Sequence, residues 1–184
     1  MATAGGLLTL DLGKRTGFAD GMPATRPRAG AVLLAKDREG RAVAVSNMIA
    51  WLEGEFAAGV PALVVKEAAL PLQAFLKREN AEATVRLTYA LHGAVEGMCV
   101  RFGIRCEDVA VATARKHFLG RPNLGSREDT KLAVVKRCHL LKLLRPEVDD
   151  DNIADALCIH DWAGATFFRR SASSKELYFF GEQP

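Results

Sequence analysis

Residues 7–18 have the sequence LLTLDLGKRTGF, and the expected fold is built around this stretch. Leu7 to Leu10 form an apolar, β-prone run that ends at Asp11, and a turn with Gly13 and two cations follows. The pattern predicts a buried strand that carries a carboxylate at its end. Because a carboxylate is costly to bury alone, we expect Asp11 to contact a cation, to share a proton or to bind a metal ion.

Two further stretches place acidic residues at the boundaries of predicted elements. Residues 62–67, ALVVKE, repeat the first design, because an apolar run again ends at an acid, Glu67. Residues 149–151 are three aspartates that lead into a helical pattern, in which Asp151 and Asp155 are four residues apart and share one helix face. We therefore ask whether the fold brings these acids to the end of the first strand.

The composition indicates one compact domain in a reducing compartment. The chain has 184 residues, of which 49% are apolar, enough for one core and too few for two typical domains. Its four cysteines lack metal-binding spacing and are interpreted as buried thiols. With no run of 18 apolar residues and no cleavable leader, the sequence predicts a cytoplasmic protein that does not contact a membrane. The net charge is only +3, but cations concentrate in residues 101–145 as a local basic stripe.

The order of the predicted elements is typical of an α/β domain. Three strands precede the first helix, which returns the chain to a fourth strand parallel to the first. The expected strands are residues 7–11, 17–20, 30–35, 62–67 and 104–113, and the expected helices are residues 41–57, 81–102, 128–144 and 151–169. Because adjacent parallel strands lie about 5 Å apart, this order places Glu67 near Asp11. Residues 1–170 are expected to form a single domain, with residues 171–184 as a C-terminal tail.

The predicted helix 81–102 has a broad apolar face that includes Leu87, Leu91, Val95 and Met98. Packing of this face against the sheet is the favoured interpretation. A face of this width also fits a dimer interface, so both roles remain open from the sequence.

The acids Asp11, Glu67, Asp151 and Asp155 form a candidate metal site. Like charges that converge repel one another unless divalent cations bind between them, and oxygen-only ligands suit Mg²⁺ or Mn²⁺. Two such ions about 4 Å apart activate water and stabilise the leaving oxygen in phosphodiester hydrolysis. The set therefore predicts a two-metal nuclease site. For any one of these acids alone, a helix N-cap or a solvated charge is the simpler explanation.

Cations on loops and helix starts between the acids are candidate DNA-binding residues: Lys14, Arg15, Arg115, Lys116, Arg121, Arg127 and Lys131. Positive side chains there would hold phosphates and give binding that weakens with salt. A charge run is usually a solvated face, so about half of them are expected to make no such contact. Lys131 is the cation for which we expect a catalytic role. His117 and His160 are expected to be structural.

Four motifs in this order resemble the RuvC-type Holliday-junction resolvases of the RNase H-like nuclease superfamily, and especially their phage and prophage relatives. The motifs are LTLDLGKRTGFA, VVKEAAL, TARKHFLG followed by EDTKLAVVKRC, and DDNIADALCIHDWA. The resemblance covers most of the chain and implies an α/β, RNase H-like nuclease domain with a central mixed five-stranded sheet flanked by helices on both faces. It also implies a homodimer, for which we predict contact through helix 81–102, in a bacterial cell or a phage-infected host.

The activity that this resemblance implies is that of a crossover junction endodeoxyribonuclease in DNA recombination and repair. Such an enzyme binds four-way or branched DNA and nicks two strands symmetrically, with two Mg²⁺ or Mn²⁺ ions in each active site. Carried onto this chain, Asp11, Glu67 and Asp155 occupy metal-ligand positions. Many relatives have a ligand three residues before the last aspartate, where this chain has Asn152. Asp151 lies four residues before, and we predict that it is the fourth ligand because that spacing also shares a helix face.

The resemblance also assigns residues to DNA contact. Arg115, Lys116 and Lys131 fall in the basic region that resembles the family's phosphate-contacting lysines. Leu70, three residues after Glu67, takes the place where relatives often have an aromatic side chain that wedges into the junction. Leucine inserts apolar bulk between bases but stacks less well than an aromatic ring, which bears on how selectively the protein recognises a junction.

Two alternatives remain beside this hypothesis. One is a YqgF-like nuclease with the RNase H fold that acts on RNA. The other is a non-catalytic protein that only binds branched DNA, against which the four intact acids weigh. Sugar kinases and actin-like ATPases begin with a similar strand and turn, but they need two such domains and a far longer chain.

Overall fold

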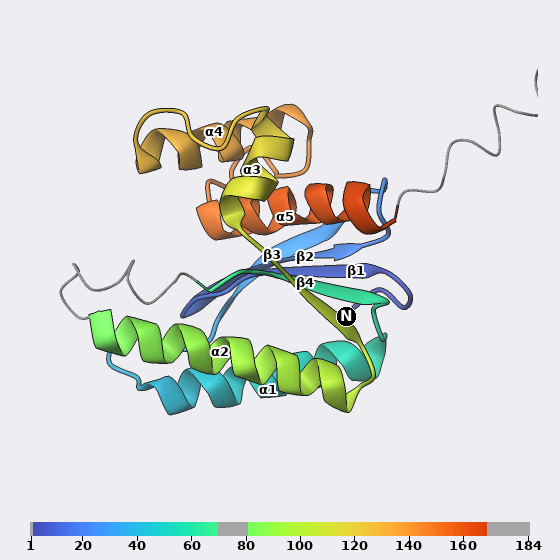
Figure 1. Cartoon of the computed structure of the whole chain (residues 1–184), viewed down its shortest axis with the longest axis vertical. Helices are drawn as coiled ribbons and strands as arrows, with labels where there is room; N and C mark the ends of the chain where they lie inside the picture. The colour runs from blue at the N-terminus through green and yellow to red at the C-terminus, as the bar shows by residue number, and fades with distance from the viewer. Residues whose placement is uncertain (1, 70–80, 169–184) are drawn as a thin grey trace, which may run out of the picture.

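The computed structural model describes residues 2–69 and 81–168 and shows a three-layer α/β domain (Figure 1). The strands are β1 (Leu7–Asp11), β2 (Arg15–Gly21), β3 (Arg28–Leu33), β4 (Leu63–Glu67) and β5 (Arg105–Val109). The helices are α1 (Arg41–Ala58), α2 (Ala81–Arg101), α3 (Val111–Leu119), α4 (Arg127–Leu140) and α5 (Asp151–Phe167). Leu70 and the tail predicted at residues 171–184 lie outside the described residues, so the wedge and the tail stay predictions.

The five strands form one mixed sheet with the order β3-β2-β1-β4-β5. The first three strands are antiparallel neighbours, and β4 and β5 join parallel to β1 through helical crossovers. In the parallel register Leu10 pairs with Lys66, so the next residues along, Asp11 and Glu67, end neighbouring strands at the same edge. The predicted sheet is confirmed, and so is its central consequence that these two acids are neighbours.

Helices cover both faces of the sheet and create two cores. Leu8, Leu10 and Val64 point to one face and pack with α1 and α2, which lie together below the sheet in Figure 1. Leu7 and Val65 point to the other face and pack with α3, α4 and α5 above it. Because side chains alternate along a strand, the acids that end β1 and β4 lie on the α5 face.

The start of α5 lies directly against β1 and β2. Asp150 caps this helix, because its Oδ1 accepts hydrogen bonds from the backbone N–H groups of Asn152 and Ile153. Thr9, fully buried in β1, donates from Oγ1 to the carbonyl oxygen of Ala156 at 2.8 Å. These contacts fix the first turns of α5 over the end of the sheet.

Gly17 on β2 makes this close approach possible. A Cβ atom at that position would lie 2.0 Å from the carbonyl oxygen of Asn152 and 2.3 Å from its carbonyl carbon. Both are backbone atoms of α5 and cannot move aside as a flexible side chain would. Gly17 also pairs with Asp11 across the β1–β2 ladder, so the helix approaches at the strand position that carries the first acid.

Most predicted elements are present, and the largest difference concerns residues 104–119. The predicted strand covered residues 104–113, but β5 ends at Val109 and α3 begins at Val111. The apolar triplet 109–111 spans the junction, so its β-prone character misplaced the boundary. The helix α3 was not predicted, and β3 begins two residues earlier than expected. No helix among the described residues is long and apolar enough to cross a membrane.

We predict that Gly17→Ala lowers the free energy of unfolding by about 2 kcal/mol or more, because α5 must move away from the sheet to admit the methyl group. Chemical denaturation monitored by circular dichroism measures this change. Gly93→Ala in α2 is the matched control, because its added Cβ meets no atom within 4 Å. That variant should be neutral or stabilised by about 0.5 kcal/mol. Equal effects of the two substitutions would contradict the close-packing argument.

Candidate active site

A cavity of about 390 Å³ opens at the end of β1 and β4, between α2 on one side and α3, α4 and α5 on the other. Acids and cations from five elements line it, so it is a polar site at the carboxyl edge of the parallel strands, where α/β folds usually bind ligands. The lining residues that matter to the argument are Asp11, Glu67, His92, Arg115, Arg127, Lys131, Asn152 and Asp155.

Asp11 and Glu67 form a carboxyl pair in this cavity. The pKa of Asp11 is raised well above its usual value, first by burial, then by a hydrogen bond with Glu67 and by the negative charges of Glu67 and Asp155. The positive charge of Lys131 opposes this shift. Adjacent carboxyl groups repel one another when both are charged, so the pair favours a shared proton or a bound cation.

Asp155 is held by Arg115. The guanidinium donates from Nη2 to Oδ2 at 2.8 Å and to Oδ1 at 3.1 Å, and from Nε to Oδ1 at 3.2 Å. Both side chains are nearly buried, with exposed fractions of 12% for Arg115 and 8% for Asp155. A bidentate pair of this kind is strong and directional. We predicted that Arg115 contacts a DNA phosphate. In the structure its guanidinium instead binds Asp155, an acid of the site.

The start of α5 places Asn152, rather than Asp151, in the cavity lining. Asp151 instead forms an ion pair with Lys131, and its side chain is 38% exposed. Of the four acids predicted as ligands, the fold thus brings Asp11, Glu67 and Asp155 to one cavity and leaves Asp151 at its edge. A ligand role for Asp151 stays a prediction, which requires its carboxylate to leave Lys131.

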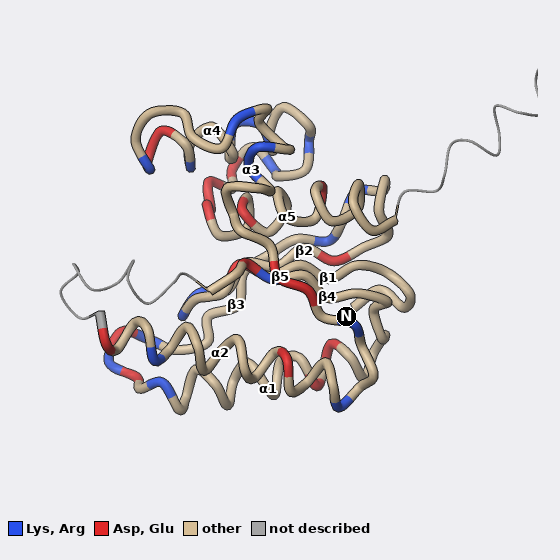
Figure 2. The backbone as a smooth tube through the Cα atoms, viewed as in Figure 1, with Lys and Arg blue, Asp and Glu red and all other residues tan. Residues whose placement is uncertain are grey.

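The predicted cations divide into two groups. Arg127 and Lys131, one turn apart on α4, line the cavity together with Arg115. The others lie outside it: Arg15 pairs with Asp150 at 2.5 Å, Lys14 donates to a backbone carbonyl at 3.2 Å, and Lys116 and Arg121 are exposed. Figure 2 shows Lys and Arg along α3 and α4, beside the acids at the start of α5. DNA contacts by the outer group stay predictions.

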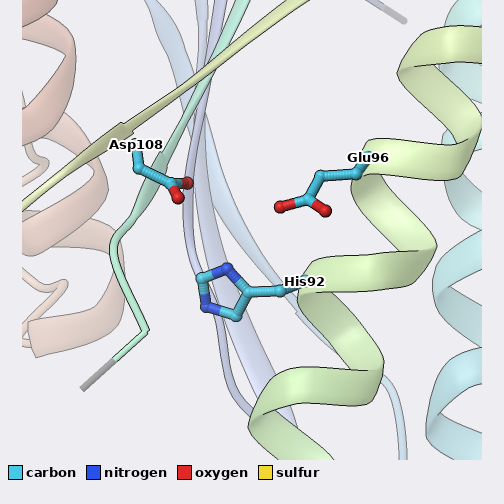
Figure 3. Close-up of side chains that lie close together, drawn as sticks. All are labelled: His92, Glu96 and Asp108. Atoms are coloured by element: carbon cyan, nitrogen blue, oxygen red, sulfur yellow. The ribbon is translucent and has the colours of Figure 1, made fainter. Parts of the chain in front are cut away.

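A second polar cluster lies behind the cavity, on the α2 face of the sheet. The potential ligand atoms of His92, Glu96 and Asp108 all lie within 4.8 Å of one another (Figure 3). Among the described residues, this is the one group of three such side chains at this spacing. The ammonium of Lys66 lies between them, 3.0 Å from His92 Nδ1 and 3.0 Å from Glu96 Oε1, and it also bonds Asp108. An internal cation therefore already compensates these side chains.

Sequence analysis missed the contribution of α2 to the site. Thr84, Thr88 and His92 line the cavity, and Glu96 follows at the same spacing of four residues, so one polar stripe runs along the helix. That spacing was a readable signal. A second signal was Lys66, a cation inside an otherwise apolar strand, which must find buried partners.

The acids that line the cavity fit a hard divalent cation. Carboxylate oxygens are the ligands that Mg²⁺ and Mn²⁺ prefer, and burial together with the nearby charges of Glu67 and Asp155 raises the pKa of Asp11. Asp11 and Glu67 are already adjacent, whereas Asp155 must turn from Arg115 to share an ion with them. A metal ion would thus replace the proton of the carboxyl pair and compete with Arg115.

Comparison with known proteins gives solved structures of the same architecture. No protein-family model and no curated protein matches the chain. The structure of Thermus thermophilus RuvC is 19% identical, with a TM-score of 0.58 over 84% of this chain and 90% of that one. RuvC from T. thermophilus in complex with a Holliday junction substrate is 17% identical, with a TM-score of 0.56 over 84% and 88%.

A third solved structure extends the likeness beyond bacteria. The yeast mitochondrial Holliday junction resolvase Ydc2 is 10% identical, with a TM-score of 0.54 over 88% of this chain and 78% of that one. At such low identity the likeness concerns the fold, and it agrees with the mixed five-stranded sheet and with the motifs noted in the sequence. The chain has the fold of the RuvC-type Holliday-junction resolvases.

Proposed function

We propose that this protein is a metal-dependent, structure-selective endodeoxyribonuclease that resolves four-way or branched DNA junctions by paired nicks. The observation that carries the proposal is the carboxyl pair of Asp11 and Glu67, in one cavity with Asp155 and with cations from α3 and α4. A two-metal hydrolase needs acids that converge beside a positive surface able to hold a phosphate backbone. The likeness to solved resolvases supports the branched-DNA substrate.

In this proposal Asp11, Glu67 and Asp155 hold Mg²⁺ or Mn²⁺, two ions in each site, with Asp151 as the fourth ligand. The bound metal supplies an activated water and stabilises charge at the scissile phosphate. If Asp155 held the metal, the Arg115 guanidinium that now binds it would be available to a phosphate oxygen. In this proposal Arg115 balances the charge of Asp155 when no metal is bound and contacts the DNA when a metal is bound.

The cations on α4 are proposed to hold the DNA strand at the cavity. Arg127 and Lys131 are one turn apart, so their charges follow one side of the opening. Lys131 also lowers the pKa of Asp11 and bonds Asp151, which places it in the electrostatic network of the acids. For that reason we retain a catalytic role for Lys131 and a binding role for Arg127.

The first prediction from this site concerns stability. Because the folded protein raises the pKa of Asp11, the charged form costs stability at neutral pH, and Asp11→Asn should stabilise the metal-free protein by about 1 kcal/mol. Mg²⁺ should raise the melting temperature of the wild type and leave that of the variant nearly unchanged. Thermal melts with EDTA or Mg²⁺ measure both effects.

Asp37→Asn is the matched control for these melts, because Asp37 is exposed and does not line the cavity. It should leave both the stability and the Mg²⁺ response of the wild type intact. A destabilised Asp11→Asn protein that still responds to Mg²⁺ would contradict the assignment of this carboxyl as a metal ligand.

The second prediction concerns activity. With Mg²⁺ the wild type should cut a four-way DNA junction in preference to forked and linear duplexes of matched sequence. Asp11→Asn and Glu67→Gln should each lower the cleavage rate by about 100-fold or more, because each removes charge at the metal, while junction binding by gel shift is retained. Asp149→Asn, an acid whose side chain is 80% exposed, is the control and should cut normally.

The other possible functions give different results in the same assay. Preferred cleavage of an RNA duplex would favour the RNA nuclease. Junction binding that neither leads to cleavage nor responds to divalent ions would favour a non-catalytic binding protein. Cleavage of all DNA substrates at one rate would contradict structure selectivity.

The third prediction concerns assembly through α2, which we propose as the homodimer contact. Leu91, Val95 and Met98 on its apolar face are buried in the core, as the favoured interpretation required. Val100, on the same helix, is 81% exposed and available for a partner. Light scattering at micromolar concentration should give a dimer that Val100→Glu weakens, and Leu140→Glu on α4, where Leu140 is 71% exposed, should not. A wild-type monomer would contradict the proposal.

A further inference from the structure

The buried ammonium of Lys66 organises the cluster on the α2 face of the sheet. Lys66 is 1% exposed, and its Nζ contacts His92, Glu96 and Asp108. The carboxylates of Asp108 and Glu96 both accept hydrogen bonds from this amine, and two carboxylates in direct contact stabilise its charged form. The lysine is therefore a fixed positive charge at the position that a metal ion would need, so the cluster is already filled.

This contact fixes the protonation of His92. An ammonium has only hydrogen-bond donors, so Nδ1 of His92 must accept from Lys66 Nζ at 3.0 Å. Burial and the adjacent positive charge lower the pKa of His92 and keep its ring neutral. A neutral imidazole that accepts at Nδ1 carries its proton on Nε2. The tautomer of His92 is thus set by Lys66.

The other side of the imidazole ring belongs to the candidate active site. His92 lines the cavity with Thr88 and Thr84, which lie one and two turns earlier on α2. In Figure 3 one ring nitrogen points between Glu96 and Asp108, and the other points away from both. His92 thus joins two environments, because its Nδ1 contacts the Lys66 cluster and the residue also lines the cavity.

We infer that His92 donates a hydrogen bond from Nε2 to a phosphate oxygen of the DNA strand bound in the cavity, and that Lys66 is a positioning residue that acts through His92. This inference rests on the proposed nuclease function. It adds a neutral donor on the α2 side of the cavity, across from the cations of α3 and α4. A neutral donor there orients a phosphate without competing with a metal ion for the acids.

The test compares two substitutions that place an amide N–H differently. The amide nitrogen of His92→Gln overlays the Nε2 position, whereas that of His92→Asn overlays Nδ1. In single-turnover cleavage of a four-way junction, His92→Asn should be slower than the wild type by about 10-fold to 100-fold, and His92→Gln should recover most of the loss. Equal rates for Asn, Gln and wild type would overturn the inference, provided that melts show all three folded.

A nitrogen NMR measurement tests the role of Lys66 without any activity. The ¹⁵N shifts of His92 should show the Nε2–H tautomer in the wild type and a loss of that preference in Lys66→Met. A wild-type Nδ1–H tautomer would overturn the inference. If Lys66→Met does not fold, the wild-type tautomer and the Asn and Gln pair still decide it.

The same spectra separate this inference from the proposed function. If the wild type cuts no DNA, the nuclease proposal fails, and the Nε2–H resonance is then followed as junction DNA is added without divalent ions. A shift of that resonance on addition of junction DNA supports the phosphate contact. An unchanged resonance overturns it.

Discussion

The structure depends most on how closely the first turns of α5 approach the sheet. Gly17 has no side chain to keep Asn152 away, and Thr9 bonds the carbonyl of Ala156, so the helix backbone lies on β1 and β2. This contact brings Asp155 into the cavity at the strand ends. A wider separation, typical of a helix packed through large side chains, would leave the third acid away from the carboxyl pair.

The charges of the site are balanced from two sides of the sheet. Above it, Arg115 holds Asp155, and the positive charge of Lys131 acts on Asp11. Below it, the Lys66 ammonium neutralises a separate cluster that reaches the cavity only through His92. The acids that line the cavity are thereby kept apart from the acids that pair with Lys66. The ligand atoms of His92, Glu96 and Asp108 lie close together. Because Lys66 already compensates these residues, they do not mark the metal position that we propose.

Local sequence patterns were enough to predict the arrangement of the central strands. The apolar runs that end at Asp11 and Glu67, and the helix between them, predict parallel neighbours, and the register confirms this. The start of α3 was not predicted, because the apolar triplet 109–111 has no turn residue to mark the boundary. Tertiary contacts between distant segments pair Arg115 with Asp155 and Lys66 with its three partners. The periodicity of the sequence does not encode such contacts, so these pairs were not predicted.

Lys66 and Glu67 are consecutive residues with opposite charges, and β4 sends them to opposite faces of the sheet. A pairing error of one residue would exchange them, so that an ammonium would enter the acidic cavity and a carboxylate would face Glu96 and Asp108. Such a misaligned chain would bring three carboxylates together below the sheet and would lose the pair of Asp11 and Glu67 above it. The two opposite charges thus favour the observed register of β4 over a register shifted by one residue.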